Sequence, residues 1–239
     1  IILSNFDFKD IDIKCFKYLL EKRLKFEPIS KIINKKFFWK HQFYVNSNVL
    51  DPRPETEIIL EEFLINIANK HKKINVLDIG TGSGCLAVSI AKEYSKAKIT
   101  AIDVSKKALE VAKKNVFSNN LQNQISLKLE QFYNLDEKFD VIVSNPPYLS
   151  YEEYDKLQIN VKNYEPKLAL SGGKDGLRFY KLFAKKIEVI MSNNSFLILE
   201  IGHNQLNSCL NIFKKSNLKL KKISKDINKI DRTLTFFKI

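Results

Sequence analysis

The stretch Val76-Leu77-Asp78-Ile79-Gly80-Thr81-Gly82-Ser83-Gly84 decides the fold, because an apolar segment runs into three glycines at alternate positions. The apolar segment predicts a buried strand, and the glycines predict a tight turn into a helix that reaches about Tyr94. Glycine lets a ligand approach the main chain closely, and the free N–H groups of the following helix point toward the turn. The stretch therefore predicts the first strand, turn and helix of an α/β fold with a ligand crevice.

Strand-like and helical segments alternate along the rest of the chain. This alternation predicts a parallel sheet with helices on both faces, since parallel strands need crossover connections. The expected strands are residues 75–80, 98–104, 125–130, 139–145, 196–201, 218–223 and 233–238, and the expected helices reach about 94 and 119 and lie near 176–191 and 203–216.

The segment before the first glycine is different in character. Residues 10–26 carry apolar side chains at helical spacing and predict a short amphipathic helix. Residues 37–49 alternate aromatic and polar side chains and predict a β-hairpin. A helix is expected over residues 55–70, with its inward face formed by Ile58, Ile59, Phe63 and Ile67.

Composition bounds the class of protein. With 239 residues, 44% of them hydrophobic, the chain can bury a full α/β core. Its apolar runs fall short of the roughly 20 residues that cross a bilayer, and its amino terminus lacks a signal-peptide pattern, so we expect no membrane segment and a cytoplasmic location. No metal site or disulfide is expected from the spacing of the cysteines and histidines, which are Cys15, Cys85, Cys209, His41, His71 and His203.

The formal charge of +13 raises the question of nucleic-acid binding. Only four of the 40 basic residues are arginine, and the lysines are scattered along the chain. A nucleic-acid surface should instead cluster its charge and favour the forked donors of arginine. We therefore interpret the charge as a composition bias and expect no direct nucleic-acid substrate.

The turn and the second strand together predict a cofactor crevice. Asp103 ends that strand 19 residues after Gly84, where its carboxylate can accept hydrogen bonds from both hydroxyls of a ribose. Gly82, Gly84 and Ala87 also satisfy the loose dinucleotide fingerprint, so the loop alone leaves a nicotinamide cofactor and S-adenosylmethionine both open. The Asp78-x-Gly-x-Gly-x-Gly form and the motif after the fourth strand favour S-adenosylmethionine.

That motif is Asn145-Pro146-Pro147-Tyr148, which follows the buried-strand pattern of residues 139–144. The carboxyl edge of the sheet, where the motif must lie, is the edge at which open α/β folds bind ligands. The two prolines stop the strand and stiffen the loop. The Asn145 side-chain oxygen and the Pro146 carbonyl can then accept hydrogen bonds from one NH2 group, and Tyr148 offers a flat face for stacking.

This arrangement suits methyl transfer to a planar NH2 group. The nitrogen lone pair of an amide or an exocyclic amine is delocalised, so the nitrogen is a poor nucleophile. Two acceptors that hold its hydrogens orient it and stabilise the positive charge that develops as a methyl group arrives. No strong general base is required. At this point a nucleobase and a glutamine amide are equally plausible targets.

Over residues 20–239 the chain resembles the bacterial peptide chain release factor N5-glutamine methyltransferases. The motifs that carry the resemblance are Pro52-Arg53-Pro54-Glu55-Thr56-Glu57, Gly80 to Gly84, Asp103, Asn145 to Tyr148, Glu165-Pro166 through Ala169-Leu170, Gly172-Gly173-x-Asp175-Gly176-Leu177 and Glu200-x-Gly202-x-x-Gln205. The resemblance implies an α/β fold with a Rossmann-like, class I methyltransferase sheet of seven strands, the last of them antiparallel. It implies as substrate the glutamine in the Gly-Gly-Gln motif of class 1 release factors.

The resemblance also implies roles for single residues. Gly80, Thr81, Gly82, Ser83, Gly84, Asp103, Phe132 and Asn145 would bind S-adenosylmethionine, with S-adenosylhomocysteine as product. Asn145, Pro146, Pro147 and Tyr148 would bind the substrate amide, with Asn145, Pro146 and Tyr148 catalytic. Arg53 and Glu57 are either contacts to substrate or cofactor or structural residues. Trp39 is expected to pack rather than to serve as a substrate platform.

The same resemblance implies a division of the chain and a set of partners. Residues 1–36 would be the remnant of a helical substrate-recognition domain, residues 37–52 a hairpin linker and residues 53–239 the catalytic domain. The expected partners are class 1 release factors, and the expected state is a monomer. The alternatives are a nucleic-acid amino methyltransferase acting on N6 of adenine or N2 of guanine, and a binding module that has lost activity.

Overall fold

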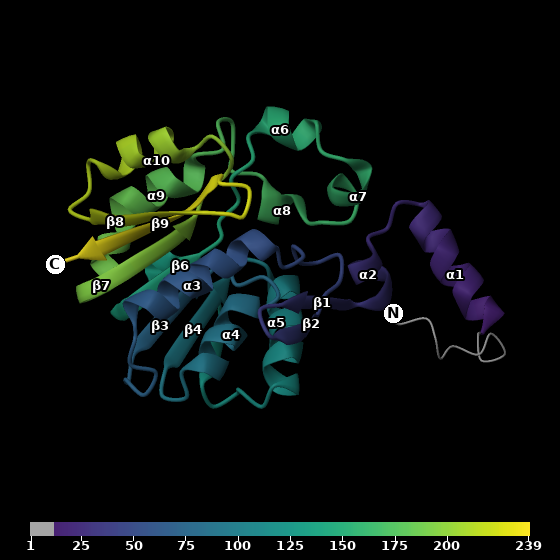
Figure 1. Cartoon of the computed structure of the whole chain (residues 1–239), viewed down its shortest axis with the longest axis horizontal. Coiled ribbons are helices and arrows are strands. Elements are labelled where there is room, and N and C mark those ends of the chain that lie inside the picture. The colour runs from purple at the N-terminus through teal and green to yellow at the C-terminus, as the bar shows by residue number, and fades with distance from the viewer. Residues whose placement is uncertain (1–11) are drawn as a thin grey trace.

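Five parallel strands extend inward from one edge of a seven-stranded sheet, which has the order β5-β4-β3-β6-β7-β9-β8 (Figure 1). The computed structural model describes residues 12–239. β9 pairs antiparallel with both of its neighbours, β7 and β8, as expected for the last strand. The strands are β3 (Asn75–Ile79), β4 (Lys98–Asp103), β5 (Ile125–Leu129), β6 (Phe139–Ser144), β7 (Met191–Glu200), β8 (Lys219–Lys225) and β9 (Asp231–Lys238).

Helices cover both faces of the sheet (Figure 1). The helices that follow the early strands are α4 (Cys85–Glu93) and α5 (Lys106–Ser118), and α3 (Glu57–Asn66) precedes them. The opposite face of the sheet carries α9 (Arg178–Lys186) and α10 (Leu206–Phe213). Three short helices, α6 (Tyr151–Asp155), α7 (Ile159–Lys162) and α8 (Lys167–Leu170), lie between β6 and α9. The predicted α/β sheet is confirmed, and these short helices are an addition.

The central strands are apolar on both sides because each side faces a layer of helices. Val76 and Val141 lie in the core beneath α3 and α4, whereas Leu77 and Ile142 lie in the core beneath α9 and α10. Successive residues of a strand point to opposite faces, so a strand covered on both faces needs an unbroken apolar run. The inward residues predicted for the helix before the sheet, Ile58, Ile59, Phe63 and Ile67, are all buried.

The predicted hairpin exists, but its position is different. It consists of β1 (Lys35–Phe38) and β2 (His41–Tyr44), with Lys35 opposite Tyr44. The sequence places the hairpin over residues 37–49, which extends the second strand too far, because residues 46–49 turn instead. Phe38 and Phe43 of the hairpin lie in the same core cluster as α3 and α4. Trp39 packs against that core and donates its indole N–H to Glu93, at 3.0 Å.

The amino-terminal helix predicted over residues 10–26 is α1 (Ile13–Leu24), which Asp12 caps by accepting a hydrogen bond from the Cys15 N–H. Asp10 and Ile11 lie outside the described residues. A second short helix, α2 (Ile29–Ile33), joins α1 to the hairpin. Within residues 12–239, no helix has the length and apolar character needed to cross a membrane.

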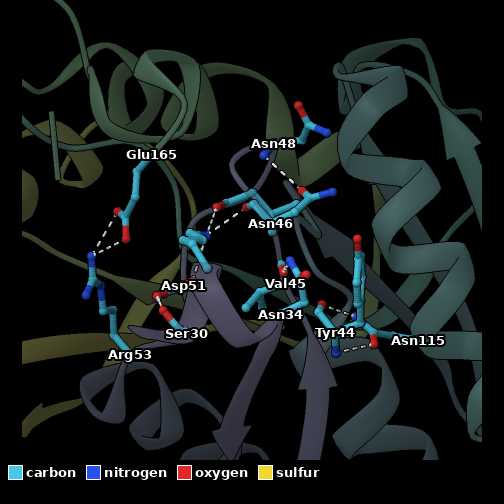
Figure 2. A network of polar contacts seen from close by, with 12 residues as sticks. Ser30, Asn34, Tyr44, Val45, Asn46, Asn48, Asp51, Arg53, Asn115 and Glu165 are labelled. Atoms are coloured by element: carbon cyan, nitrogen blue, oxygen red, sulfur yellow. Dashed lines mark hydrogen bonds and ion pairs between the residues drawn. The ribbon is translucent and has the colours of Figure 1, made fainter. Parts of the chain in front are cut away.

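A buried lysine explains why the second hairpin strand ends at Tyr44. The Lys31 ammonium donates to the carbonyl oxygens of Asn46, at 2.8 Å, and Val49, at 2.6 Å, so these carbonyls turn inward. It also pairs with Asp51 at 2.6 Å, and both side chains are at most 5% exposed. Asp51 accepts a further hydrogen bond from the Ser30 hydroxyl (Figure 2). The pair thereby fastens α2 to the loop of residues 46–53.

We expect Lys31→Met to destabilise the protein strongly. The change leaves the Asp51 carboxylate buried without its charge partner and leaves two carbonyls without a donor, and breaking a buried pair in this way costs about 3–5 kcal/mol. The free energy of unfolding from urea titration measures the loss. Lys156→Met is the control, because Lys156 and Glu152 form an ion pair that is more than 70% exposed on both sides, and such pairs contribute about 0–1 kcal/mol. Equal losses in the two variants would contradict this interpretation.

Candidate active site

The glycine turn, residues 80–84 at the end of β3, is held by backbone hydrogen bonds to β4. The N–H groups of Gly80 and Thr81 both donate to the carbonyl oxygen of Ile102 on β4, at 2.9 Å each. Gly82 has a φ of +55°, a conformation that a side chain disfavours. The Thr81 hydroxyl donates to Asp78 at 2.6 Å, and burial raises the pKa of the Asp78 carboxyl to about 7. The turn is therefore fixed from beneath by β4 and by Asp78.

Asp103 lies beside this turn at the end of β4. One carboxylate oxygen accepts from the Gly82 N–H at 3.0 Å, and the other accepts from the Ser105 N–H at 2.9 Å. Burial raises the pKa of Asp103, and the backbone donors oppose that shift. Each carboxylate oxygen has a second lone pair, so the group can still accept hydrogen bonds from a ligand.

The acceptor loop, residues 145–148, starts next to the glycine turn. β3 and β6 pair in parallel with Ile79 opposite Ser144, and the Ser144 hydroxyl donates to the Ile79 carbonyl at 2.8 Å. Gly80 and Asn145 therefore leave the sheet side by side. The Asn145 side-chain nitrogen donates to the Thr56 hydroxyl oxygen at 2.8 Å. This bond leaves the Asn145 amide oxygen as the acceptor available to a ligand.

Tyr148 ends the acceptor loop with its side chain turned toward the protein. Its ring packs with the core cluster beneath α9 and α10, and its carbonyl accepts from the Gln205 side chain at 2.8 Å. Gln205 also accepts from the Gly202 N–H at 3.0 Å, so it fixes the turn after β7 as well. Burial raises the pKa of the Tyr148 hydroxyl far above its ordinary value.

The segment of residues 170–172 pairs with the residue that follows the acceptor loop. Leu149 and Ser171 form an isolated parallel bridge, in which the Leu149 N–H donates to Leu170 at 3.0 Å and the Gly172 N–H donates to Leu149 at 2.8 Å. A Cβ atom on Gly172 would lie 2.7 Å from the carbonyl oxygen of Pro147. The glycine in this motif is therefore required by the close approach of two backbones.

One cavity joins the glycine turn to the acceptor loop. Among the residues that the sequence singles out, its lining includes Gly80, Thr81, Gly82, Ser83, Asp103, Phe132, Asn145 and Pro147. Gly84, Pro146 and Tyr148 are not among the residues that line it. Phe132 is buried and packs on Phe183 of α9, with ring centroids 5.1 Å apart. The structure thus brings together most of the predicted cofactor and substrate residues around a single space.

Several lining residues were not predicted from the sequence. They come from the loop before α3, from the ends of β4 and β5, from α8 and from α9, and they include Val49, Leu50, Val104, Glu130, Gln131, Leu168, Phe179 and Leu182. The position of Glu130 and Gln131 directly after a predicted strand could have indicated them, since ligands bind at that edge. The apolar residues of α8 and α9 carry no such signal.

Arg53 and Glu57, whose roles the sequence leaves open, both have partners within the protein. The Arg53 guanidinium contacts both oxygens of Glu165, at 2.7 and 2.8 Å (Figure 2). The Glu165 side chain is 2% exposed, and burial raises its pKa while the charge of Arg53 opposes the shift. Glu57 accepts from the backbone N–H of Trp39 at 2.6 Å. Arg53 thus joins two walls of the cavity, and Glu57 fixes the hairpin turn.

Comparisons with known proteins agree with this geometry. The family described as "Methyltransferase small domain" matches residues 56–162. The chain is 41% identical over 222 residues to the release factor glutamine methyltransferase of Thermodesulfovibrio yellowstonii, a match that covers 91% of this chain and 79% of that relative. It is 36% identical to the bifunctional methyltransferase of Rickettsia prowazekii, covering 98% of this chain and 49% of that relative, so it spans about half of that protein.

Among solved structures, a methyltransferase from Pyrococcus furiosus superposes with a TM-score of 0.57 at 18% identity, covering 94% of this chain and 98% of that one. The sheet order, the glycine turn and the acceptor loop define a class I S-adenosylmethionine-dependent methyltransferase. The relatives that this chain covers over most of their length narrow the class further. The chain belongs to the release factor glutamine methyltransferase family.

The cavity suits the cofactor of this class. A Cβ atom on Gly80 would meet no atom within 4 Å, so the space above the turn is open to a ligand. Asp103 supplies a carboxylate that can hold hydroxyl groups, and Phe132 supplies an apolar ring to the lining of the same cavity. These groups match the polar ribose and the flat adenine of a nucleoside.

We expect Gly172→Ala to impair methyl transfer without impairing cofactor binding. The added Cβ would collide with the carbonyl oxygens of Gly176 and Pro147 and displace the acceptor loop, and a displacement of about 1 Å can lower turnover on the order of 100-fold. Turnover measures the first effect, and calorimetry with S-adenosylmethionine measures the second. Ser171→Ala, which changes the neighbouring residue without adding an atom, should behave as wild type. Normal turnover in Gly172→Ala would show that the loop tolerates the displacement.

Proposed function

We propose that this protein transfers a methyl group from S-adenosylmethionine to the side-chain amide nitrogen of glutamine in the Gly-Gly-Gln motif of class 1 peptide chain release factors. Membership of the release factor glutamine methyltransferase family supports the substrate. The Asn145 amide supports the proposed chemistry most directly. Its nitrogen is hydrogen-bonded to the Thr56 hydroxyl, so its oxygen remains available to the substrate.

The chain's own residues would hold and orient the substrate amide. The Asn145 oxygen and the Pro146 carbonyl would each accept one hydrogen of the substrate NH2 group, which directs the nitrogen toward the cofactor. Both acceptors stabilise the positive charge that develops on that nitrogen. Bound S-adenosylmethionine supplies an electrophilic methyl group on its sulfonium. The nitrogen gains this methyl group and loses one proton to solvent, and S-adenosylhomocysteine remains.

Cofactor binding is assigned to the turn and its neighbours. Gly80 to Gly84 would let the cofactor approach the main chain, Asp103 would accept from the ribose hydroxyls, and Phe132 would contact the adenine. Tyr148 is proposed to support the acceptor loop and the substrate amide. The partners are class 1 release factors, which implies a cytoplasmic location, and the protein is proposed to act as a monomer with its catalytic domain over residues 53–239.

We expect Asn145→Ala to lower turnover by about 100- to 1,000-fold, because it removes an acceptor that is needed as charge develops. Cofactor affinity should change little, since the glycine turn and Asp103 remain. Turnover with a recombinant release factor and calorimetry with S-adenosylmethionine measure the two effects. Near-normal turnover would refute the role of Asn145.

A direct assay separates the proposed substrate from nucleic acid, whose exocyclic NH2 groups the same acceptors could hold after base flipping. The purified protein is mixed with labelled S-adenosylmethionine and, separately, with a class 1 release factor, DNA and RNA. We expect label on the release factor alone, and none on a release factor whose Gly-Gly-Gln glutamine is replaced by alanine. Label on DNA or RNA, with none on the release factor, would overturn the proposal.

A further inference from the structure

Three side chains from distant parts of the chain form a hydrogen-bonded row behind the acceptor loop. The Asn145 nitrogen donates to the Thr56 hydroxyl oxygen at 2.8 Å, and the Thr56 hydroxyl donates to Glu200 at 2.6 Å. Thr56 lies in the short 3-10 helix before α3, and Glu200 is the last residue of β7. Thr56 is 3% exposed and Glu200 is 1% exposed, so water does not compete for these bonds.

We propose that Thr56 and Glu200 are positioning residues that set which end of the Asn145 amide faces the substrate. The inference rests on the proposed function, because it assigns these two residues to the orientation of the group that would hold the substrate NH2. Asn145 lines the cavity, and Thr56 lines it beside Asn145, whereas Glu200 acts through Thr56.

The direction of each hydrogen bond follows from the one beyond it. An ionised carboxylate can only accept, so Glu200 commits the single hydrogen of the Thr56 hydroxyl. The Thr56 oxygen is then left with lone pairs alone, and it can only accept from Asn145. The Asn145 amide must therefore turn its NH2 group to Thr56 and its oxygen to the cavity. If the amide were reversed, the Asn145 oxygen would face the Thr56 oxygen, so two acceptors would meet. The Asn145 NH2 group would then face the substrate NH2 group, so two donors would meet.

Burying a carboxylate for packing alone would be unfavourable, since an apolar side chain of similar volume avoids the cost of desolvation. Burial raises the pKa of Glu200 to about 7, opposed in order by the Thr56 hydroxyl, the Tyr148 hydroxyl and the charge of Arg232, while the charge of Glu55 adds to the rise. The pKa of the carboxyl therefore stays near neutral, because the Thr56 and Tyr148 hydroxyls and the charge of Arg232 favour the ionised form.

The protonation state of Glu200 changes what Thr56 can do. Above pH 7 the carboxylate is ionised and fixes the hydroxyl as an acceptor toward Asn145. Below pH 7 the protonated carboxyl can donate to Thr56, whose own hydrogen is then free to turn to Asn145, and both amide orientations become possible. Turnover at saturating substrate should therefore fall as the pH falls through about 7.

The first test compares conservative variants at pH 8 with a release factor as substrate. Thr56→Val should lower kcat on the order of 10- to 100-fold, since a misoriented acceptor is comparable to a misplaced one. KM and the affinity for S-adenosylmethionine should stay within about threefold, and Thr56→Ser, which keeps the hydroxyl, should restore most of kcat. Thr235→Val is the matched control, because that buried hydroxyl has no hydrogen-bond partner within residues 12–239.

The second test is the pH profile of kcat. Wild type should lose turnover below about pH 7, and Glu200→Gln should have lower kcat at pH 8 and no such limb, because its amide does not titrate. Asp78, whose pKa is also about 7, lies at the cofactor turn. Saturating S-adenosylmethionine removes its effect on cofactor binding from the profile.

The third test does not depend on turnover. The Asn145 side-chain NH2 gives a pair of proton resonances, identified by their loss in Asn145→Ala. The hydrogen-bonded proton should move upfield in Thr56→Val and keep its position in Thr56→Ser. An unchanged resonance in folded Thr56→Val, or a kcat within threefold of wild type, would overturn the inference. Failure of wild type to methylate the release factor would overturn the proposed function instead, while the resonance would still test the orientation of Asn145.

Discussion

The parallel pairing of β3 with β6 is the constraint on which the site depends. With Ile79 opposite Ser144, the two strands end at the same level, and the Ser144 hydroxyl fastens one end to the other. A shift of one residue would turn the side chains of β6 to the opposite face and separate the glycine turn from the acceptor loop. The core on both faces of the sheet resists such a shift, so burial of apolar residues fixes the geometry of the polar site.

The walls of the cavity are held by polar partners that are remote in sequence. Glu165 holds Arg53, Gln205 holds the Tyr148 carbonyl, and Glu200 holds Thr56. Each partner is buried or half-buried, where a hydrogen bond is protected from water and an unpaired group would be costly. The residues expected to touch the ligands are therefore supported by a second set whose own conformations are restrained.

Local patterns were enough to predict much of the fold and part of the site. The strand before Gly80 and the strand before Asn145 were predicted from apolar runs, and glycine and proline marked the turns after them. The hairpin was placed too late because its second strand ends at a turn that Lys31 holds from 15 residues away. The short helices α6 to α8 and the Thr56–Glu200 contact, which spans 144 residues, leave no periodic signal in the sequence. What depends on long-range polar contacts could not be read from the sequence.

The place of β9 in the sheet has a consequence for biosynthesis. β9 lies between β7 and β8, although both of these strands are made before it. Until residues 231–238 are available, β7 is therefore an open edge of the sheet and β8 has no strand partner, and unpaired edges are prone to association with other chains. Leu234 and Phe236 of β9 also complete the core beneath α9 and α10. This side of the sheet therefore closes only when the last strand of the sequence pairs with β7 and β8.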